Sequence, residues 1–402
     1  MIDNELIEKC EKSLVESFKK IDNVSLYNQE KVLNAFRKNQ IALRHFCGTT
    51  GYAYGDEGRD TLNKLVADVF GAESAICSAN IVSGTHAISL CLYGVLRPGD
   101  LCLSITGEPY DTLQEVVSKE GGGSLKDLNI EFKSIPLKDG KIDKEKIKES
   151  FARKMPKMVY LQRSRGYEWR DAFSVEQIKE AVDYVRSEGF DGCIMLDNCY
   201  GEFVEKTEPT EVGVNLMAGS MIKNPGGGIA PTGGYVVGDE KYVDLVGKRL
   251  TAPSIGREVG SNYSGYQLYY QGLFLAPHVV GQALKGSMLF GKVLTELGYE
   301  VSPSIDKIPS DIIRAIKFND RNAMVSFVQG IQIYSPIDSF ALPMPWDMPG
   351  YEDQVIMAAG CFVQGASIEL SADGPVRPPY IAYLQGGLTY EHCKIALKNL
   401  EL

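Results

Sequence analysis

Two stretches, read together, decide the fold. Residues 193–203 are CIMLDNCYGEF, an apolar run that ends in Asp197. Residues 218–238 are AGSMIKNPGGGIAPTGGYVVG, in which Lys223 follows a short apolar run and precedes a glycine-rich turn and another apolar run. Short continuous apolar runs bounded by turn residues are typical of buried strands. We therefore place Asp197 at the end of one strand and Lys223 in a turn before another.

Around these stretches, strand-like and helix-like segments alternate. The strand-like runs include AICSA, LCLSIT, IEFKSIP, MVYLQR and CIMLDN, and the helical ones include TLNKLVADVFG, HAISLCLYGVL and SVEQIKEAVDYVRSEG. Such alternation predicts βαβ units, and hence a mostly parallel sheet with helices on both faces. Sheets of this kind bind ligands at the carboxyl ends of their strands, so we expect the chemistry in the loops that follow the strands.

The flanking regions depart from this pattern. Residues 3–20 and 25–39 carry apolar residues at helical spacing before anything resembling a sheet, so we interpret them as an arm packed on a partner subunit. A long helical region, roughly 265–297, leads into a smaller α+β pattern. The predicted division is an N-terminal helical arm (1–48), a large α/β domain (49–285) and a small C-terminal α+β domain (286–402).

Two loops carry groups suited to an anion and to an aromatic ring. In SANIVSGTHAISLCL, Ser83, Gly84 and Thr85 directly precede a helix, whose N-terminus favours a phosphate. Tyr110, in ITGEPYDTL, follows the next strand and is placed to stack on a cofactor. Taken singly, each has a plainer interpretation, as a helix cap or as a packed loop tyrosine.

Asp197 and Lys223 form the pair that a pyridoxal 5′-phosphate (PLP) enzyme needs. The lysine amine forms the Schiff base, and a carboxylate keeps the pyridine nitrogen protonated so that the ring accepts electrons. Alone, such an Asp is commonly a cap and such a Lys is commonly solvated. Together with the candidate phosphate loop, the pair favours PLP.

In their order, these pieces resemble the cystathionine γ-synthase/β-lyase and methionine γ-lyase family of fold-type I PLP enzymes. DNCY resembles the family's D-N-T-F segment, and SMIK before the glycines resembles its S-x-T-K-x-x-G-G segment. Longer strings resemble the divergent branch of methionine γ-lyase-like or aluminium-resistance proteins: GYAYGDEGRDTL, VSGTHAI, PYDTL, QRSRGY, KNPGGGIAPTGGYVVG and ELSADGP. The resemblance implies an aspartate aminotransferase-like fold, with a seven-stranded, mostly parallel sheet and a smaller C-terminal domain.

The resemblance also implies a role for each matching position. Lys223 would hold PLP, Asp197 would pair with the ring nitrogen, and Tyr110 would stack on the ring and assist proton transfer. Tyr54 and Arg59 match a segment that reaches the phosphate of the neighbouring subunit, which implies a homodimer or homotetramer with shared active sites. The phosphate itself would lie among small and hydroxylated residues: Ser83, Gly84, Thr85 and Ser220.

The sequence departs from the family pattern in three places, two on the cofactor side of the site and one on the substrate side. Ile222 replaces the threonine before the lysine, and QRSRGYEW replaces the segment that binds the ring oxygen, for which Ser164 is the remaining candidate. Tyr383, in YLQGGL, stands where the family has its carboxylate-binding arginine. A guanidinium binds a carboxylate through two hydrogen bonds, so an arginine should serve an amino-acid substrate. The candidates are Arg377, Arg163 and Arg165.

Composition excludes several classes of function. The formal net charge of −10 argues against sequence-independent binding to nucleic acid. The N-terminus lacks the apolar stretch of a signal peptide, and no apolar run approaches membrane-spanning length. The nine cysteines and four histidines do not show zinc-site spacing, so we expect no metal. We expect a cytoplasmic protein with a small amino-acid substrate.

These observations predict a PLP-dependent carbon–sulfur lyase acting on a sulfur-containing amino acid, of the cystathionine β-lyase or methionine γ-lyase type. They leave open β- or γ-elimination, a γ-synthase and an aminotransferase. A non-catalytic, regulatory PLP-fold protein is a second class, although it would have no need of Lys223. A nucleotide-binding enzyme is disfavoured, because in KNPGGG the lysine precedes the glycines, whereas a P-loop places G-K-[ST] after them.

Overall fold

The centre of the large domain is a seven-stranded sheet in the order β1-β7-β6-β5-β4-β2-β3. The fold comes from a computed structural model that describes residues 2–401. Neighbouring strands from β6 to β3 are parallel, and β7 is antiparallel to both of its neighbours. This confirms the predicted mostly parallel sheet. Its strands are β1 (Ser74–Ser78), β2 (Leu101–Ser104), β3 (Glu131–Ser134), β4 (Met158–Gln162), β5 (Cys193–Asp197), β6 (Leu216–Ser220) and β7 (Gly234–Gly238).

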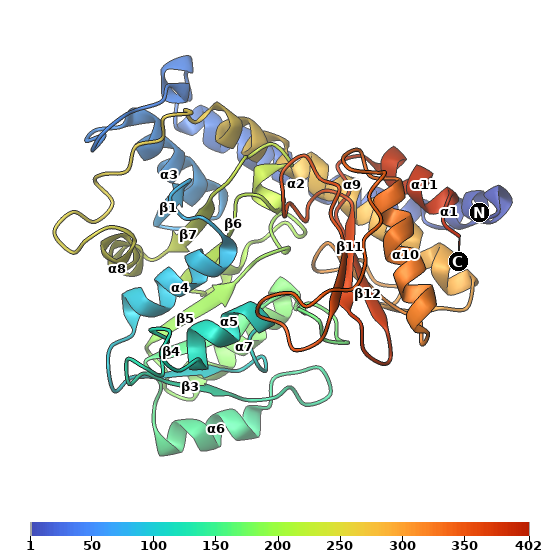
Figure 1. Ribbon diagram of the computed structural model, residues 1–402. Helices are drawn as coiled ribbons and strands as arrows, with labels where there is room; N and C mark the ends of the chain where they lie inside the picture. The colour runs from blue at the N-terminus through green and yellow to red at the C-terminus, as the bar shows by residue number, and fades with distance from the viewer. Residues whose placement is uncertain (1, 402) are drawn as a thin grey trace.

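Both faces of this sheet are buried, which is why its central strands read as continuous apolar runs. Along β5, Ile194 and Leu196 belong to one apolar core, whereas Cys193 and Met195 belong to a second core on the opposite face. Helices cover both faces, as Figure 1 shows. The helices of this domain are α3 (Glu57–Val69), α4 (Gly84–Val95), α5 (Asp111–Ser118), α6 (Lys144–Arg153), α7 (Val175–Ser187) and α8 (Glu240–Leu250), with the short 3₁₀ turns η1 (Leu43–Phe46), η2 (Pro209–Val212) and η3 (Asn224–Gly226).

The N-terminal arm consists of α1 (Asn4–Ser13) and α2 (Val15–Lys38) and packs on its own chain. The break between the two helices lies at Leu14, and not between residues 20 and 25 as predicted. α2 runs through that predicted gap, where its Ile21 is buried. Asn28 donates hydrogen bonds from Nδ2 to the carbonyls of Phe203 and Glu205, both at 3.0 Å. The arm therefore stabilises the segment that follows β5, and this segment lies next to the site described below.

The small domain is built on a five-stranded antiparallel sheet in the order β10-β11-β12-β9-β8. It confirms the predicted α+β pattern and lies beside the large sheet in Figure 1. The predicted domain boundary at 285/286 lies inside the long helix α9 (Gln267–Glu296), which contacts both parts, and this division stays a prediction. The remaining elements are β8 (Glu300–Ser302), β9 (Ile313–Lys317), α10 (Arg321–Ile333), β10 (Val355–Ala358), β11 (Ser371–Pro375), β12 (Ile381–Gln385) and α11 (Tyr390–Lys398). None of the helices in residues 2–401 combines the length and apolar character needed to cross a membrane.

Candidate active site

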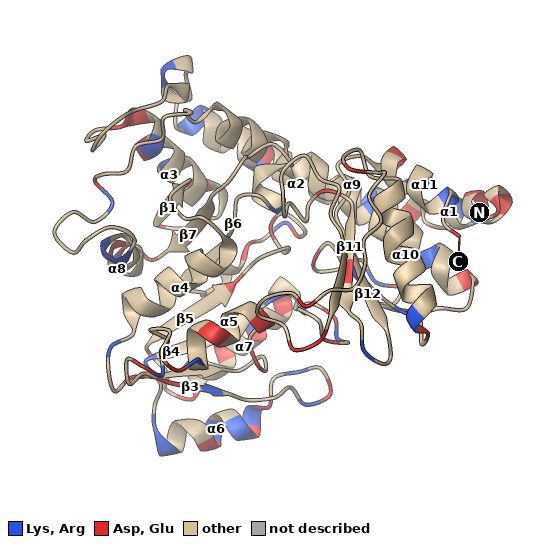
Figure 2. Cartoon of the chain, in the orientation of Figure 1, with Lys and Arg blue, Asp and Glu red and all other residues tan. Residues whose placement is uncertain are grey.

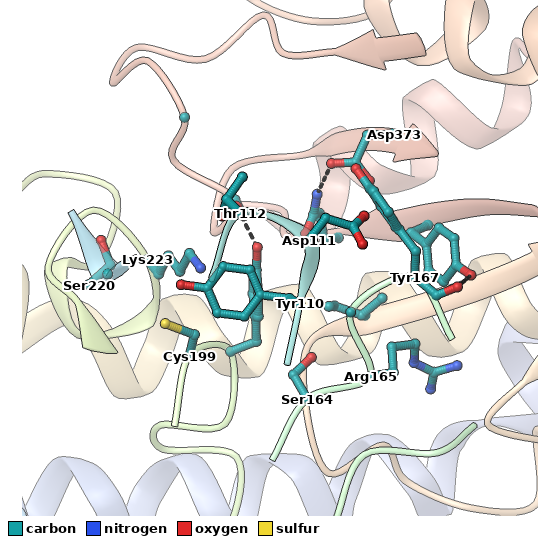
Figure 3. A pocket seen from close by; sticks show the side chains of 18 of the residues that line it. Tyr110, Asp111, Thr112, Ser164, Arg165, Tyr167, Cys199, Ser220, Lys223 and Asp373 are labelled. Atoms are coloured by element: carbon teal, nitrogen blue, oxygen red, sulfur yellow. Dashed lines mark hydrogen bonds between the residues drawn. The ribbon is translucent and has the colours of Figure 1, made fainter. Parts of the chain in front are cut away.

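A cavity of about 490 Å³ lies where the carboxyl ends of the large sheet meet β11 and β12 of the small domain. Figure 3 shows side chains from both domains converging on it. This is the location expected for a ligand in an open α/β sheet. Of the candidate site residues named from the sequence, the cavity brings together ten: Ser83, Gly84, Thr85, Tyr110, Ser164, Arg165, Asp197, Ser220, Lys223 and Arg377.

Lys223 is held in a turn that packs backbone against backbone on α9. Gly227 has a φ of +56°, and a Cβ there would lie 2.5 Å from the carbonyl oxygen of Gly272. A side chain at Gly227 in the turn, or at Gly272 on the helix, would push the turn away from the helix. This close approach explains why glycines follow the lysine. Asn224 ties the turn to the neighbouring loop by donating to the carbonyl of Tyr200 at 3.0 Å. The Lys223 ammonium consequently lies 3.9 Å from the centroid of the Tyr200 ring.

Asp197 ends β5 as a buried carboxylate. Its Oδ1 accepts a hydrogen bond from the backbone N–H of Cys199 at 3.0 Å. Burial raises the pKa of Asp197, and the charge of Lys223 offsets part of that increase. Burial lowers the pKa of Lys223, but the acidic groups around it, Cys199 first and Asp197 among them, raise it above its ordinary value. The pKa values of the two residues are therefore coupled, because the charge of each favours the charged form of the other.

The N-terminus of α4 forms a cradle of small residues. A Cβ on Gly84 would lie 3.2 Å from Cys199 Sγ and 3.5 Å from Ser220 Cβ, so the loops after β1, β5 and β6 meet here. Ser83 caps the helix, because its hydroxyl accepts from the backbone N–H of His86 at 3.0 Å. Backbone N–H groups at such a helix end favour an anion.

Tyr110 stands beside this cradle. Its hydroxyl donates to Thr85 Oγ1 at 2.9 Å, and its backbone N–H donates to Gln162 Oε1 at 2.9 Å. Burial raises the pKa of Tyr110, so the phenol keeps its proton. Ser164 also lines the cavity, where its hydroxyl donates to Asp311 Oδ2 at 2.9 Å.

Three residues singled out from the sequence lie outside the cavity. Arg163 is buried behind it, where its guanidinium donates to Glu205, Asn198 and two backbone carbonyls. Tyr54 is 68% exposed on the surface. Arg59 donates to Asp60 and to the carbonyl of Ala53. Arg377 lines the cavity, but its side chain is half exposed and donates to Asp353 at 2.8 Å.

The small domain contributes cavity residues that we did not select from the sequence. Asp373 on β11 accepts from Gln385 Nε2 on β12 at 3.0 Å. Burial raises the pKa of Asp373 to about 7, with hydrogen bonds from Gln385 and Tyr167 and the charge of Lys223 opposing the increase. The string ELSADGP, which carries the resemblance, is the signal that points to Asp373. Figure 2 shows acidic positions on β11 and α5, which lie on either side of the cavity.

The residues present fit PLP. An amine, a carboxylate at a strand end, an aromatic ring and a helix N-terminus are the groups that the aldehyde, ring nitrogen, ring face and phosphate require. The observation that carries this fit is the cradle at Gly84, which a single Cβ would fill.

Comparisons with known proteins agree with this geometry. The model of a family described as methionine gamma-lyase matches residues 3–401. The chain belongs to this family. This confirms the resemblance seen in the sequence, and PLP is the cofactor of the family.

Individual members of the family are close in sequence and fold. The uncharacterized protein YnbB of Bacillus subtilis (strain 168) is 51% identical over 94% of this chain and 91% of its own. A structure from Listeria monocytogenes, provisionally named a cystathionine beta-lyase involved in aluminum resistance, is 49% identical over 99% of both chains, with a TM-score of 0.96. A carbon-sulfur lyase involved in aluminum resistance from Clostridium novyi NT is 48% identical over 98% and 94% of the chains, with a TM-score of 0.94.

Proposed function

We propose that this protein is a PLP-dependent carbon–sulfur lyase acting on a sulfur-containing amino acid. The observation that carries the proposal is the meeting of Lys223, Asp197 and the N-terminus of α4 in one cavity. The name of the Clostridium novyi relative, a carbon-sulfur lyase, supports the reaction class.

The chemistry divides between the cofactor and the chain. Bound PLP withdraws electrons from the substrate Cα, which allows a thiol to leave from Cβ or Cγ. Asp197, buried at the end of β5, would hold a proton on the ring nitrogen of the cofactor. Lys223 Nζ would accept the proton from the substrate Cα. Tyr110 would assist proton transfer, and its raised pKa keeps the phenol protonated.

A visible absorption spectrum with borohydride reduction tests the cofactor assignment. We expect a band that borohydride bleaches, with the pyridoxyl label mapped to Lys223. Lys223→Ala should abolish both the label and turnover, whereas Lys241→Ala, an exposed lysine outside the cavity, should retain both. A protein that takes up no PLP, or turnover by Lys223→Ala at the wild-type rate, would refute the proposal.

A product assay resolves the type of elimination. Cystathionine, cystine and methionine should be supplied to the purified enzyme, and pyruvate and 2-oxobutyrate measured. Pyruvate from cystathionine or cystine indicates β-elimination, and 2-oxobutyrate from methionine indicates γ-elimination. Full PLP occupancy without turnover of any sulfur amino acid would instead favour a regulatory PLP-fold protein.

We also propose that a second copy of this chain completes the site. The segments around residues 49–54 and 260–263 are joined by hydrogen bonds and leave Tyr52, Tyr54 and Tyr263 between 68% and 86% exposed. Large exposed aromatic side chains gathered in one place indicate an interaction surface. Sedimentation should give a dimer or tetramer. If sites are shared, mixing Lys223→Ala with Tyr54→Ala subunits should restore activity that neither variant has alone, and a monomeric active protein would contradict the sharing.

A further inference from the structure

Arg165 is a buried cation with unpaired donors. The residue is 0% exposed, and its Nη1 donates to Ser302 Oγ at 2.9 Å. Its Nε and Nη2 are also buried and have no hydrogen-bond partner among residues 2–401. Buried guanidinium groups are normally paired, because an unpaired buried charge is strongly unfavourable.

Asp311 and Asp171 are the carboxylates whose charges act most strongly on Arg165, but both accept hydrogen bonds from other groups. Asp311 accepts from Ser164 Oγ at 2.9 Å and from the backbone N–H of Ile313 at 3.1 Å. Asp171 accepts from Ser302 Oγ at 2.9 Å and from Lys307 at 3.4 Å. Neither forms an ion pair with Arg165 in the described part of the chain.

Arg165 lines the same cavity as Lys223. In Figure 3, Arg165 and Tyr167 lie on the side of the site opposite to Lys223. Tyr383 packs on Tyr167 with ring centroids 5.1 Å apart and donates to its backbone carbonyl at 2.6 Å. The position at which the family carries an arginine is thus filled by a tyrosine, and the loop after β4 brings a guanidinium to the same end of the cavity.

The guanidinium groups of the two other candidate arginines, unlike that of Arg165, are paired with carboxylates. Arg163 is equally buried, but its guanidinium donates four hydrogen bonds, one of them to the carboxylate of Glu205 at 2.7 Å. Arg377 is half exposed and paired with Asp353. Arg165 alone among the three combines burial, a place in the cavity and free donors.

We propose that Arg165 binds the carboxylate of an amino-acid substrate through Nε and Nη2, in place of the arginine that the family carries at the position of Tyr383. Adjacent guanidinium N–H groups match the two oxygens of a carboxylate, and such charge-assisted pairs give both affinity and orientation. The proposal rests on the proposed function only in taking an amino acid as the ligand.

A matched pair of ligands tests this binding without requiring turnover. L-Methionine and its decarboxylated analogue, 3-(methylsulfanyl)propylamine, differ only in the carboxylate. Dissociation constants would be measured from the visible spectrum of the holoenzyme. We expect the wild type to favour L-methionine. Arg165→Met should weaken L-methionine binding on the order of 100-fold and change binding of the amine by about twofold or less. Arg165→Lys should fall between, because an ammonium cannot make the paired contact.

Stability separates a binding role from a structural one. Arg165→Met removes an unpaired buried charge, so its melting temperature should equal or exceed that of the wild type. Arg163→Met, the matched control, leaves Glu205 and Asn198 without their donor, so its melting temperature should fall. The proposal is wrong if Arg165→Met is destabilised as much as Arg163→Met, or if the wild type binds both ligands equally. It is also wrong if Arg377→Gln, rather than Arg165→Met, abolishes the preference for L-methionine. If the protein binds L-methionine tightly but forms no product, the proposed lyase activity is wrong, whereas the binding role of Arg165 is not affected.

Discussion

Replacing Asp373 with asparagine tests how the cavity responds to pH. The pKa of this carboxyl rises from 3.8 to about 7 because of burial, a shift of about three units. The folded protein holds the proton of Asp373 more tightly than the unfolded chain does. Protonated Asp373 therefore contributes stability that is fully present at low pH. It is lost as pH rises from the unfolded pKa, near 4, to the folded pKa, near 7. At ~1.4 kcal/mol per unit, the loss is at most about 4 kcal/mol over the whole window, and about 2 to 3 kcal/mol between pH 5 and pH 8.

The assay is urea unfolding of wild type and Asp373→Asn at pH 5, 6, 7 and 8. Asparagine keeps an oxygen that can accept from Gln385 and cannot ionise. The free energy of unfolding of the variant, relative to wild type, should therefore rise with pH up to about 7 and then level off. Glu202→Gln is the control. Its pKa is raised to about 8 by burial and it does not line the cavity, so its difference curve should keep rising to pH 8. A difference between wild type and Asp373→Asn that is constant from pH 5 to pH 8 would refute the reasoning.

Two further substitutions test the cofactor side of the site. Asp197→Asn should keep the pyridoxyl label on Lys223 but lower kcat by ~100-fold or more, because an amide cannot hold the ring proton; unchanged kcat would contradict that role. Gly84→Ala should weaken PLP binding, measured by titration of the apoprotein, because its Cβ enters the cradle at 3.2 Å from Cys199 Sγ. Gly122→Ala, where a Cβ meets no atom closer than 3.9 Å, should bind PLP like the wild type.

Much of the large domain could be predicted because its signals are local. Its buried strands are short apolar runs between turn residues, and the loops after them carry Tyr110, Asp197 and Lys223 at the edge where such sheets bind ligands. Strand β6 is harder to predict from the sequence, because LMAGS contains alanine and glycine and forms only a short apolar run. Its place in the sheet depends on pairing with β5 and β7, which the sequence does not reveal.

The substrate side of the cavity could not be predicted in the same way. Asp373 and Gln385 reach the cavity because the small domain docks against the end of the large sheet, and Asp373 forms no local motif with Lys223. The choice among the arginines has a similar cause. Arg163 and Arg165 are two residues apart in one loop, and only the tertiary partners of each guanidinium distinguish them.

Arg165 and Asp373 together lead to a last prediction. A carboxylate bound by Arg165 would bring negative charge into the cavity that Asp373 also lines. Because like charges disfavour each other, the bound ligand should raise the pKa of Asp373 further and make the enzyme take up a proton near pH 7. Calorimetric titration of L-methionine at pH 7.5, in buffers with different enthalpies of ionisation, would measure that proton.

Proton changes at the substrate ammonium are common to both proteins, so the uptake by wild type should exceed that by Asp373→Asn by a substantial fraction of one proton. The amine analogue lacks the carboxylate, so it should not cause this uptake through Asp373. Equal uptake with both ligands would show that the carboxylate does not reach Asp373. Because linkage is reciprocal, the same coupling requires L-methionine to bind more weakly as pH rises through 7 in wild type, and less so in Asp373→Asn.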